Sequence, residues 1–501
     1  MALYFNEDFE NFMANHPAGE MNEAGLRKQA GAFFLGQTRG VFFNVNARRA
    51  CYGSQVLDPL WKNLVPGDDG KYYHRGKDAF VSCSPVLKNA LGAKMLYDRL
   101  GNKVFPIRID ECRRQGGKGG LSMRMNDIHL CIFPESSFHT DFWYEHPRWR
   151  LERYLYPEYP QMDGCGLDYA VPQVRELMKK FIAELFELFD MDALELDWMR
   201  TPPFFQEGTE ERNAPFLEEI VSFASGKRHE AEKRFSHEIR LTVRVPSRPE
   251  EALAAGLDVC SWAKKGLVDM VVPCAFCLAD GNIPLRVWRA LLPEKVDLVP
   301  GLDNLSCAWD GGKRMYNNAE LVFGYAASLF HDGAKDLYLF NHMDSLKRVI
   351  GEGSYEKILR FAGEKESAEK QSRRHLVTAC QNLIPGIPCH SPLPLKIGES
   401  FQRLRMETGG NFAGRKKEIL LGFDSEKHRE KIDDFACVLN GTPCPFLPEG
   451  KELPELPEND WKVFRYAVPE GALQEGSNVV AVRAVHETGK TDLVWCEIDI
   501  F

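Results

Sequence analysis

The sequence predicts a parallel (β/α)8 barrel followed by a smaller β-sandwich. Eight short apolar runs alternate with helical segments up to about residue 350, and beyond them the pattern becomes entirely β-type. The change falls near the proline-rich segment 383–395, which we expect to be a linker. Because a chain of 501 residues is too long for one compact core, we expect a barrel domain at 1–382 and a sandwich domain at 396–501.

The expected barrel strands are short, rich in apolar residues and followed by polar or charged ones. They are 2–8, 40–49, 119–127, 192–200, 238–247, 269–276, 296–304 and 336–343. Helices lie between several of them: 172–189 has proline in its first turn and an apolar stripe at helical spacing, and Pro249 opens another. A further helical stretch is expected near 355–382. Long connections such as 135–168 are usually functional in a barrel.

The expected sandwich strands are separated by turns that contain Gly, Pro or Asn. They are 417–423, 435–441, 462–469, 478–485 and 492–501.

Composition excludes several classes of function. The net charge of −9, from 63 Lys and Arg against 72 Asp and Glu, argues against nucleic-acid binding. The first residues contain no signal peptide, and no segment has the roughly 20 apolar residues of a membrane helix. The 14 scattered cysteines are then reduced thiols of a cytoplasmic protein, or of a secreted one if a signal was removed. Cys274 and Cys277 lack a second C-x-x-C pair, so we expect no metal and no cofactor.

The stretch 119–129, GGLSMRMNDIH, is unusual for a core strand because it ends in ionisable groups. Ser122, Arg124 and Asn126 share one face, which we expect to point into the barrel lumen, while the intervening Leu and Met residues face the helices. Burying Arg124 costs free energy unless an anion meets it. That anion is a carboxylate of the protein or of a substrate.

The carboxyl ends of the strands in such a barrel lie at one mouth, where active sites form. The polar residues expected there are Asp8, Asn44, Asn46, Arg48, Arg124, Asp127, His129, Glu195, Asp197, Arg200, Arg244, Asp303, Asn341 and His342. Paired acid and base groups are what glycoside hydrolysis requires, and the arginines favour a carboxylated sugar. We expect Asn44 and Arg48 to contact the substrate, and the aromatic loop 138–159 to stack on sugar rings.

Three features resemble the inverting exosialidases of glycoside hydrolase family 156: the pattern R-M-N-D-x-H at 124–129, a first strand ending in Asp8, and Asn341 at the end of the eighth strand. The resemblance covers nearly the whole chain, including the β-sandwich. It implies an exo-α-sialidase that releases terminal sialic acid from sialylated glycans with inversion at the anomeric carbon. It also implies Arg124 and Arg200 as ligands of the sialic acid carboxylate and Asn341 as a substrate contact.

The resemblance implies Asp8 and His129 as the catalytic pair, with Asp127 orienting His129. An inverting route suits a sialoside, because the substrate carboxylate would repel a carboxylate nucleophile. We assign His129 as the base that activates water, since a histidine held by an aspartate is a neutral base. Asp8 is then the general acid, which needs a raised pKa. The sequence supplies no distances, so the two roles could be exchanged.

Other interpretations stay open. Asp8 could cap a helix that follows it. Glu195 and Asp197 could form a buried ion-pair network with Arg124 or Arg244, with Asp197 as a reserve catalytic acid, and the aromatic loop could be packing. The chain could hydrolyse a uronic acid or a neutral glycan, or bind glycans without catalysis. A homodimer is the default expectation for the assembly.

Overall fold

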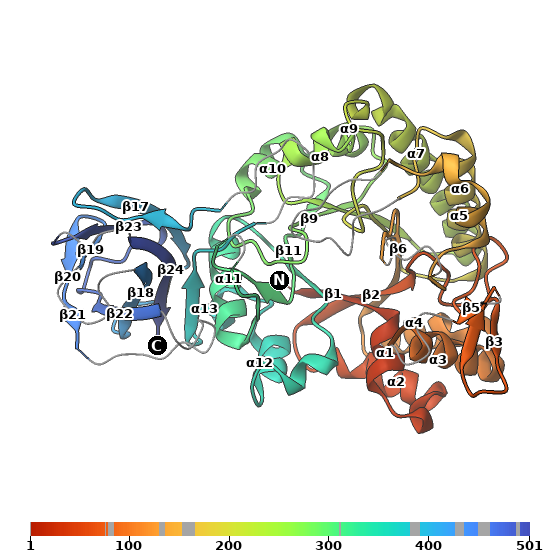
Figure 1. Ribbon diagram of the computed structural model, residues 1–501, viewed down its shortest axis with the longest axis horizontal. Helices are drawn as coiled ribbons and strands as arrows, with labels where there is room; N and C mark the ends of the chain where they lie inside the picture. The colour runs from red at the N-terminus through yellow and green to blue at the C-terminus, as the bar shows by residue number, and fades with distance from the viewer. Residues whose placement is uncertain are drawn as a thin grey trace.

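The computed structural model describes residues 2–75, 77–78, 85–129, 136–152, 166–309, 312–380, 391–425, 435–448, 461–486 and 491–501. A barrel and a sandwich lie side by side (Figure 1). The barrel strands are β1 (Leu3–Glu7), β2 (Thr38–Asn46), β6 (Lys118–Arg124), β7 (Ala193–Asp197), β8 (Arg240–Pro246), β9 (Met270–Cys274), β11 (Gly301–Leu302) and β14 (Leu337–Phe340). All neighbours are parallel, and β14 pairs with β1, which closes the barrel as predicted.

All eight expected strand positions are confirmed, with one interruption. The segment expected at 296–304 forms β10 (Asp297–Leu298) and then β11. Pro300 lies between the two pieces and has no amide hydrogen to donate, although its carbonyl still accepts from the amide of Tyr338 at 3.0 Å.

Helices surround the barrel, and the two that the sequence located most clearly are confirmed as α6 and α8. The longer helices are α1 (Phe9–Asn15), α2 (Glu23–Ala32), α3 (Pro85–Leu100), α4 (Val104–Arg114), α6 (Pro172–Leu188), α7 (Glu210–Phe235), α8 (Pro249–Ala254), α9 (Val259–Lys264), α10 (Leu285–Leu291), α11 (Ala319–His331), α12 (Ser354–Phe361) and α13 (Lys365–Glu369). The expected helix near 355–382 is wrong beyond Glu369. There β15 (Arg373–Leu376) pairs with the last strand of the chain, a contact that no local pattern reveals.

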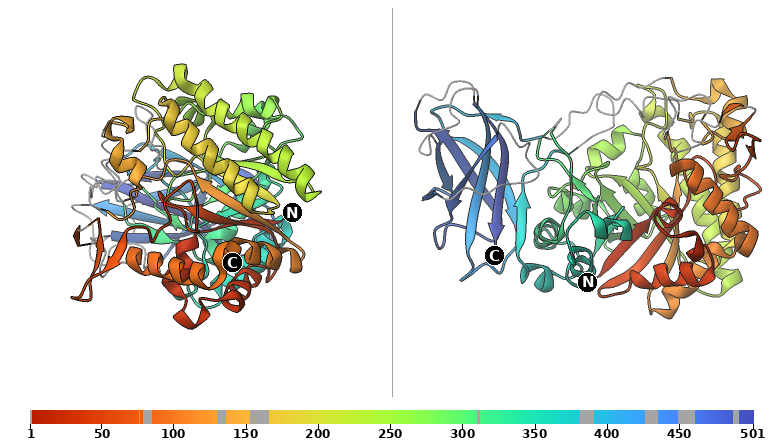
Figure 2. Two further views of the ribbon diagram at one scale, coloured as in Figure 1. Left: turned by 90° about the vertical axis from the view of Figure 1, so that its right-hand side faces the viewer. Right: turned by 60° about the horizontal axis from the view of Figure 1, so that its bottom comes forward.

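The C-terminal domain is a sandwich of two antiparallel sheets, as predicted (Figure 2). One sheet has the order β15-β24-β18-β22-β21, with β16 also on β24, and the other has the order β17-β23-β19-β20. Their bounds are β16 (Leu395–Lys396), β17 (Gln402–Thr408), β18 (Lys417–Ser425), β19 (Phe435–Leu439), β20 (Thr442–Cys444), β21 (Phe446–Leu447), β22 (Trp461–Ala467), β23 (Gly476–Ala484) and β24 (Thr491–Ile500). Residues 383–390, most of the expected linker, lie outside the described residues.

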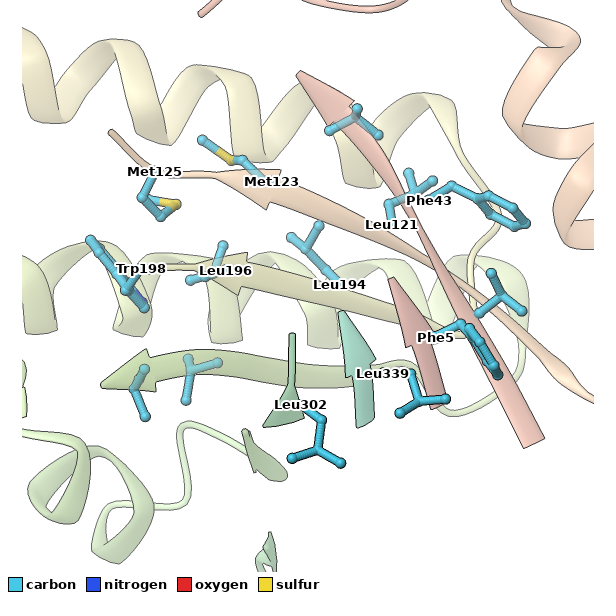
Figure 3. Packing of buried hydrophobic residues seen from close by; sticks show 14 of the residues in the cluster. Phe5, Phe43, Leu121, Met123, Met125, Leu194, Leu196, Trp198, Leu302 and Leu339 are labelled. Carbon is cyan, nitrogen blue, oxygen red and sulfur yellow. The ribbon is translucent and has the colours of Figure 1, made fainter. Parts of the chain in front are cut away.

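Side chains alternate along the barrel strands between the layer beneath the helices and the lumen of the barrel. Leu121, Met123 and Met125 pack outwards with the apolar residues of neighbouring strands, among them Leu194 and Leu196, as predicted (Figure 3). The inward positions are largely polar, and burying them requires hydrogen bonds or counter-charges. The chemistry of the barrel therefore lies in its lumen.

Glu195 occupies the middle of the lumen, where neutral donors surround it. Asn6, Ser122 and Tyr338 donate to its carboxylate at 3.0, 2.7 and 2.7 Å. Burial, with the nearby charge of Asp197, raises the pKa of Glu195 to about 7. The expected network is confirmed in part. Asp197, two residues after Glu195 on β7, pairs bidentately with Arg244, at 2.9 and 3.0 Å, and not with Arg124.

The substitution Glu195→Gln should change the pH dependence of stability. Because the folded pKa lies near 7 and the ordinary value is 4.5, the folded wild type loses stability as the pH rises through this interval. The glutamine cannot ionise, so the variant should gain about 3 kcal/mol relative to the wild type between about pH 4 and about pH 8. Urea unfolding of both proteins at several pH values measures the difference, and an offset that stays constant with pH would contradict the raised pKa.

Candidate active site

Arg124 is the centre of the polar cluster at the C-terminal mouth of the barrel. Its side chain is only 3% exposed, and its guanidinium joins two carboxylates. Nη2 donates to Oδ2 of Asp8 at 2.6 Å, and Nη1 donates to Oδ2 of Asp127 at 3.3 Å. The side chain of Asn46 holds the backbone of Arg124 on both sides, at 3.0 Å each. The anion expected beside Arg124 is therefore supplied twice by the protein itself.

Asp8 caps α1, so this interpretation of the residue is confirmed. Its Oδ1 accepts from the amide of Glu10 at 3.1 Å, while Oδ2 faces Arg124. Burial opposes the ionisation of Asp8, but Arg124 outweighs it and the pKa lies below its ordinary value. The raised pKa that a general acid needs is absent while Arg124 is paired with Asp8.

Asp127 holds His129 as the sequence predicts for an orienting residue. Oδ1 of Asp127 lies 2.8 Å from Nδ1 of His129 and accepts from the amide of His129 at 2.9 Å. Asp127 is buried, which opposes its ionisation, yet His129 and Arg124 keep its pKa well below the ordinary range. The imidazole of His129 is 36% exposed, so its second nitrogen can meet a ligand in the mouth.

Arg200 is a buried cation that lacks a carboxylate partner. It is 7% exposed, and among the described residues no carboxylate lies within ion-pair distance of it. Its neighbours are Sγ of Cys277 at 3.9 Å and the ring of Phe340 at 5.2 Å, and its Nε has no hydrogen-bond partner. Its charge favours the ionised forms of Asp8, Asp127 and Asp303. Because no carboxylate of the described residues pairs with it directly, this position is suited to an external anion.

Two carboxyl groups near the cluster were not assigned a role from the sequence. Asp303 follows β11 and is buried, which raises its pKa to about 6, and its Oδ2 has no partner. Glu10, in the first turn of α1, has a pKa raised to about 8 by burial and by Asp8. The position of Asp303 at a strand end could be predicted from the sequence. The burial that raises the pKa of both groups comes from residues distant in sequence.

The three other residues expected to contact the substrate, Asn44, Asn341 and Arg48, have different surroundings. Asn44 is buried and donates to the carbonyl of Asn46 at 2.8 Å, where the pairing of β2 with β6 shifts register, so it shapes the strand. Asn341 has a φ of 57° and a buried Oδ1 without a partner. Arg48 lies 5.1 Å from the ring centre of Trp143 and lines, with Arg124, a small pocket of about 30 Å³.

The described part of the aromatic loop packs upon itself. The ring of Trp143 lies between the imidazole of His139, 3.7 Å away, and the guanidinium of Arg150, 3.3 Å away. Trp149 stacks on His146 at 3.6 Å. These faces are occupied by protein, which supports the packing interpretation for them. The expected platform residues Tyr154, Tyr156 and Tyr159 lie outside the described residues.

Within the described ranges, no group of three or more His, Cys, Asp or Glu side chains is arranged to hold a metal ion. None of the helices in those ranges has the length and apolar character needed to cross a membrane.

No protein-family model and no curated protein matches the sequence. Among solved structures, the chain is similar to a cycloisomaltooligosaccharide glucanotransferase from Paenibacillus sp., with 8% identity and a TM-score of 0.35 over 99% of this chain and 57% of that one. An alpha-L-fucosidase from Paenibacillus thiaminolyticus is 11% identical, with a TM-score of 0.39 over 71% and 48%. An alpha-amylase from Geobacillus thermoleovorans is 10% identical, with a TM-score of 0.38 over 97% and 98%.

The chain thus spans about half the length of the first two of these proteins. Identities and TM-scores this low assign neither a family nor a function to it.

Substitution of the two mouth arginines should have different consequences for stability. Arg124→Met leaves Asp8 and Asp127 without their cation and should cost about 3 kcal/mol of unfolding free energy. Arg200→Met removes a cation that pairs with no carboxylate of the described residues and should change stability by less than about 1 kcal/mol, or increase it. Urea unfolding near neutral pH measures both. Equal losses in the two variants would contradict the different pairing of the arginines.

Proposed function

We propose that this protein is a glycoside hydrolase that releases terminal sialic acid from glycans with inversion of configuration. The observation that carries the proposal is the juxtaposition at the mouth of Arg200, which makes no ion pair with a carboxylate of the described residues, and the series Asp8–Arg124–Asp127–His129. The first suits a carboxylated sugar, and the second supplies both an acid and a base.

The substrate carboxylate is bound by arginine in this proposal. Nε of Arg200 has no partner and no carboxylate of the described residues pairs with Arg200, so its planar fork can bind the substrate without breaking an ion pair among them. Arg124 takes part only if the substrate competes with Asp8 and Asp127. We therefore assign Arg200 as the primary ligand and Arg124 as the secondary one.

His129 activates the water. Asp127 accepts from Nδ1 of His129 and fixes the ring, so Nε2 is the nitrogen that removes a proton from water. The hydroxyl oxygen bonds to the anomeric carbon as the bond to the leaving oxygen breaks on the opposite face. Asp127 stabilises the imidazolium that forms, and it remains ionised because Arg124 faces its other oxygen.

Asp8 protonates the leaving oxygen, and the substrate itself prepares it for this role. Without substrate, Arg124 keeps the pKa of Asp8 low. A bound substrate carboxylate shares Arg124 and adds a like charge near Asp8, and both effects raise the pKa of Asp8. Asp197 is a poorer candidate for the acid, because Arg244 holds both of its oxygens at 2.9 and 3.0 Å.

A panel of fluorogenic substrates tests the proposal. The purified protein should release methylumbelliferone from the α-sialoside and not from the β-glucuronide or the β-galactoside. Arg200→Met should lower kcat/KM on the sialoside by about tenfold to hundredfold, because one charge-assisted contact is lost. Hydrolysis of the glucuronide alone would move the assignment to uronic acids. Hydrolysis of the galactoside alone would contradict the role of Arg200.

The leaving group distinguishes the acid from the base. Asp8→Asn should reduce turnover of sialyllactose at least about a hundredfold more than that of the methylumbelliferyl sialoside, whose leaving group needs little protonation. His129→Ala should reduce turnover of both substrates equally, since water attacks in each case. Steady-state rates of both variants on both substrates give the comparison, and the reverse pattern would exchange the roles of Asp8 and His129.

A further inference from the structure

A second pocket, of about 350 Å³, opens at the opposite end of the barrel from the candidate active site. Its walls come from the first residues of the strands β1, β2, β6, β7, β8 and β9. This N-terminal face usually contributes only stability in such barrels. A hollow of this size is large enough for a small organic ligand.

The inner wall of the pocket is apolar and contains one unsatisfied polar atom. Tyr4, Phe42, Ala193 and Met270 line it and belong to one cluster of buried side chains in the lumen. Thr242 also lines the pocket, is 0% exposed, and its Oγ1 has no hydrogen-bond partner. Because a buried hydroxyl without a partner is costly, a polar atom of a ligand would relieve it.

The rim of the pocket is basic. Arg39, Lys118, Arg240 and Lys295 line it, and among the described residues neither Arg39 nor Lys295 has a carboxylate within ion-pair distance. The acids that line the pocket are Asp192, Glu238 and Asp269.

Two of these acids are neutralised by arginines outside the pocket. Arg113 lies 3.2 Å from Asp192, and Arg228 contacts Asp269. Two of the rim cations are themselves paired, Lys118 with Asp192 at 3.4 Å and Arg240 with Asp297 at 2.7 Å. Arg39 and Lys295 therefore supply the available positive charge, against the single acid Glu238.

The layer around Glu195 separates this pocket from the candidate active site. Along β1, Tyr4 lines the pocket, Asn6 binds Glu195, and Asp8 follows at the mouth. The same order is found along β7, where Ala193 lines the pocket and Glu195 belongs to the hydrogen-bonded layer. The two sites are thus distinct in position as well as in lining.

We propose that the pocket at the N-terminal end of the barrel binds a small amphipathic anion. An aromatic or branched aliphatic group packs against Tyr4, Phe42 and Met270. The carboxylate or sulfonate of the ligand stays at the rim near Arg39 and Lys295. This site is independent of the proposed hydrolytic function.

Anilinonaphthalene sulfonate, an aromatic anion that fluoresces in apolar sites, is the probe for this pocket. Its binding to the full chain is measured by fluorescence and by calorimetry, with saturating sialic acid present to occupy the mouth. Ala193→Met fills the inner wall, and the double variant Arg39→Ala/Lys295→Ala removes the two rim cations that pair with no carboxylate of the described residues. The matched control is Lys94→Ala/Arg114→Ala, which removes two exposed cations of α3 and α4.

We expect one bound probe per chain, loss of that binding in Ala193→Met, and affinity about tenfold weaker in the Arg39 and Lys295 double variant, as expected for the loss of two charge contacts. The control should bind as the wild type does. If Ala193→Met fails to fold, the double variant, whose substituted residues are exposed, decides the matter. Absence of binding to the wild type, or equal affinity in the double variant and its control, would overturn the proposal.

Discussion

The burial of Arg124 at the end of β6 is the constraint on which the mouth of the barrel depends. A buried guanidinium without counter-charges costs on the order of several kcal/mol. Asp8 and Asp127 compensate this charge from two directions. The contact orders Asp127, and Asp127 in turn orders His129. The requirement for a stable mouth and the requirement for a prepared base are therefore met by the same side chains.

The lumen has three levels, and their chemistry differs. Tyr4, Asn6 and Asp8 mark these levels along β1: an apolar level at the N-terminal end, a hydrogen-bonded level around Glu195, and a charged level at the mouth. Burial and the nearby charge of Asp197 raise the pKa of Glu195, in the middle level, to about 7, although the neutral donors around it oppose that rise. A barrel with this layering can hold a polar site at one end and an apolar pocket at the other.

Much of the fold could be predicted from the sequence because alternation is a local signal. The barrel strands and the five expected sandwich strands were located in this way. β15 and β17 were missed because charged residues break their apolar pattern and because their partners, β24 and β23, lie far along the chain.

The residues of the candidate site could be predicted from the sequence, whereas their charges and pKa values could not. Their positions at strand ends indicated Asp8, Arg124, Asp127 and His129, which the structure brings together. The low pKa of Asp8 depends on Arg124, 116 residues away, and the absence of a carboxylate paired with Arg200 among the described residues is a property of the whole mouth. Neither can be read from local sequence, because both depend on tertiary contacts.

The most direct measurement is a calorimetric titration with sialic acid and with its methyl ester, in which a neutral ester replaces the charged carboxylate. The account predicts that the acid binds at least about a hundredfold more tightly than the ester, because arginine binds the carboxylate. It also predicts that protons are taken up as the acid binds, since the pKa of Asp8 rises. Equal affinity for acid and ester would contradict the account.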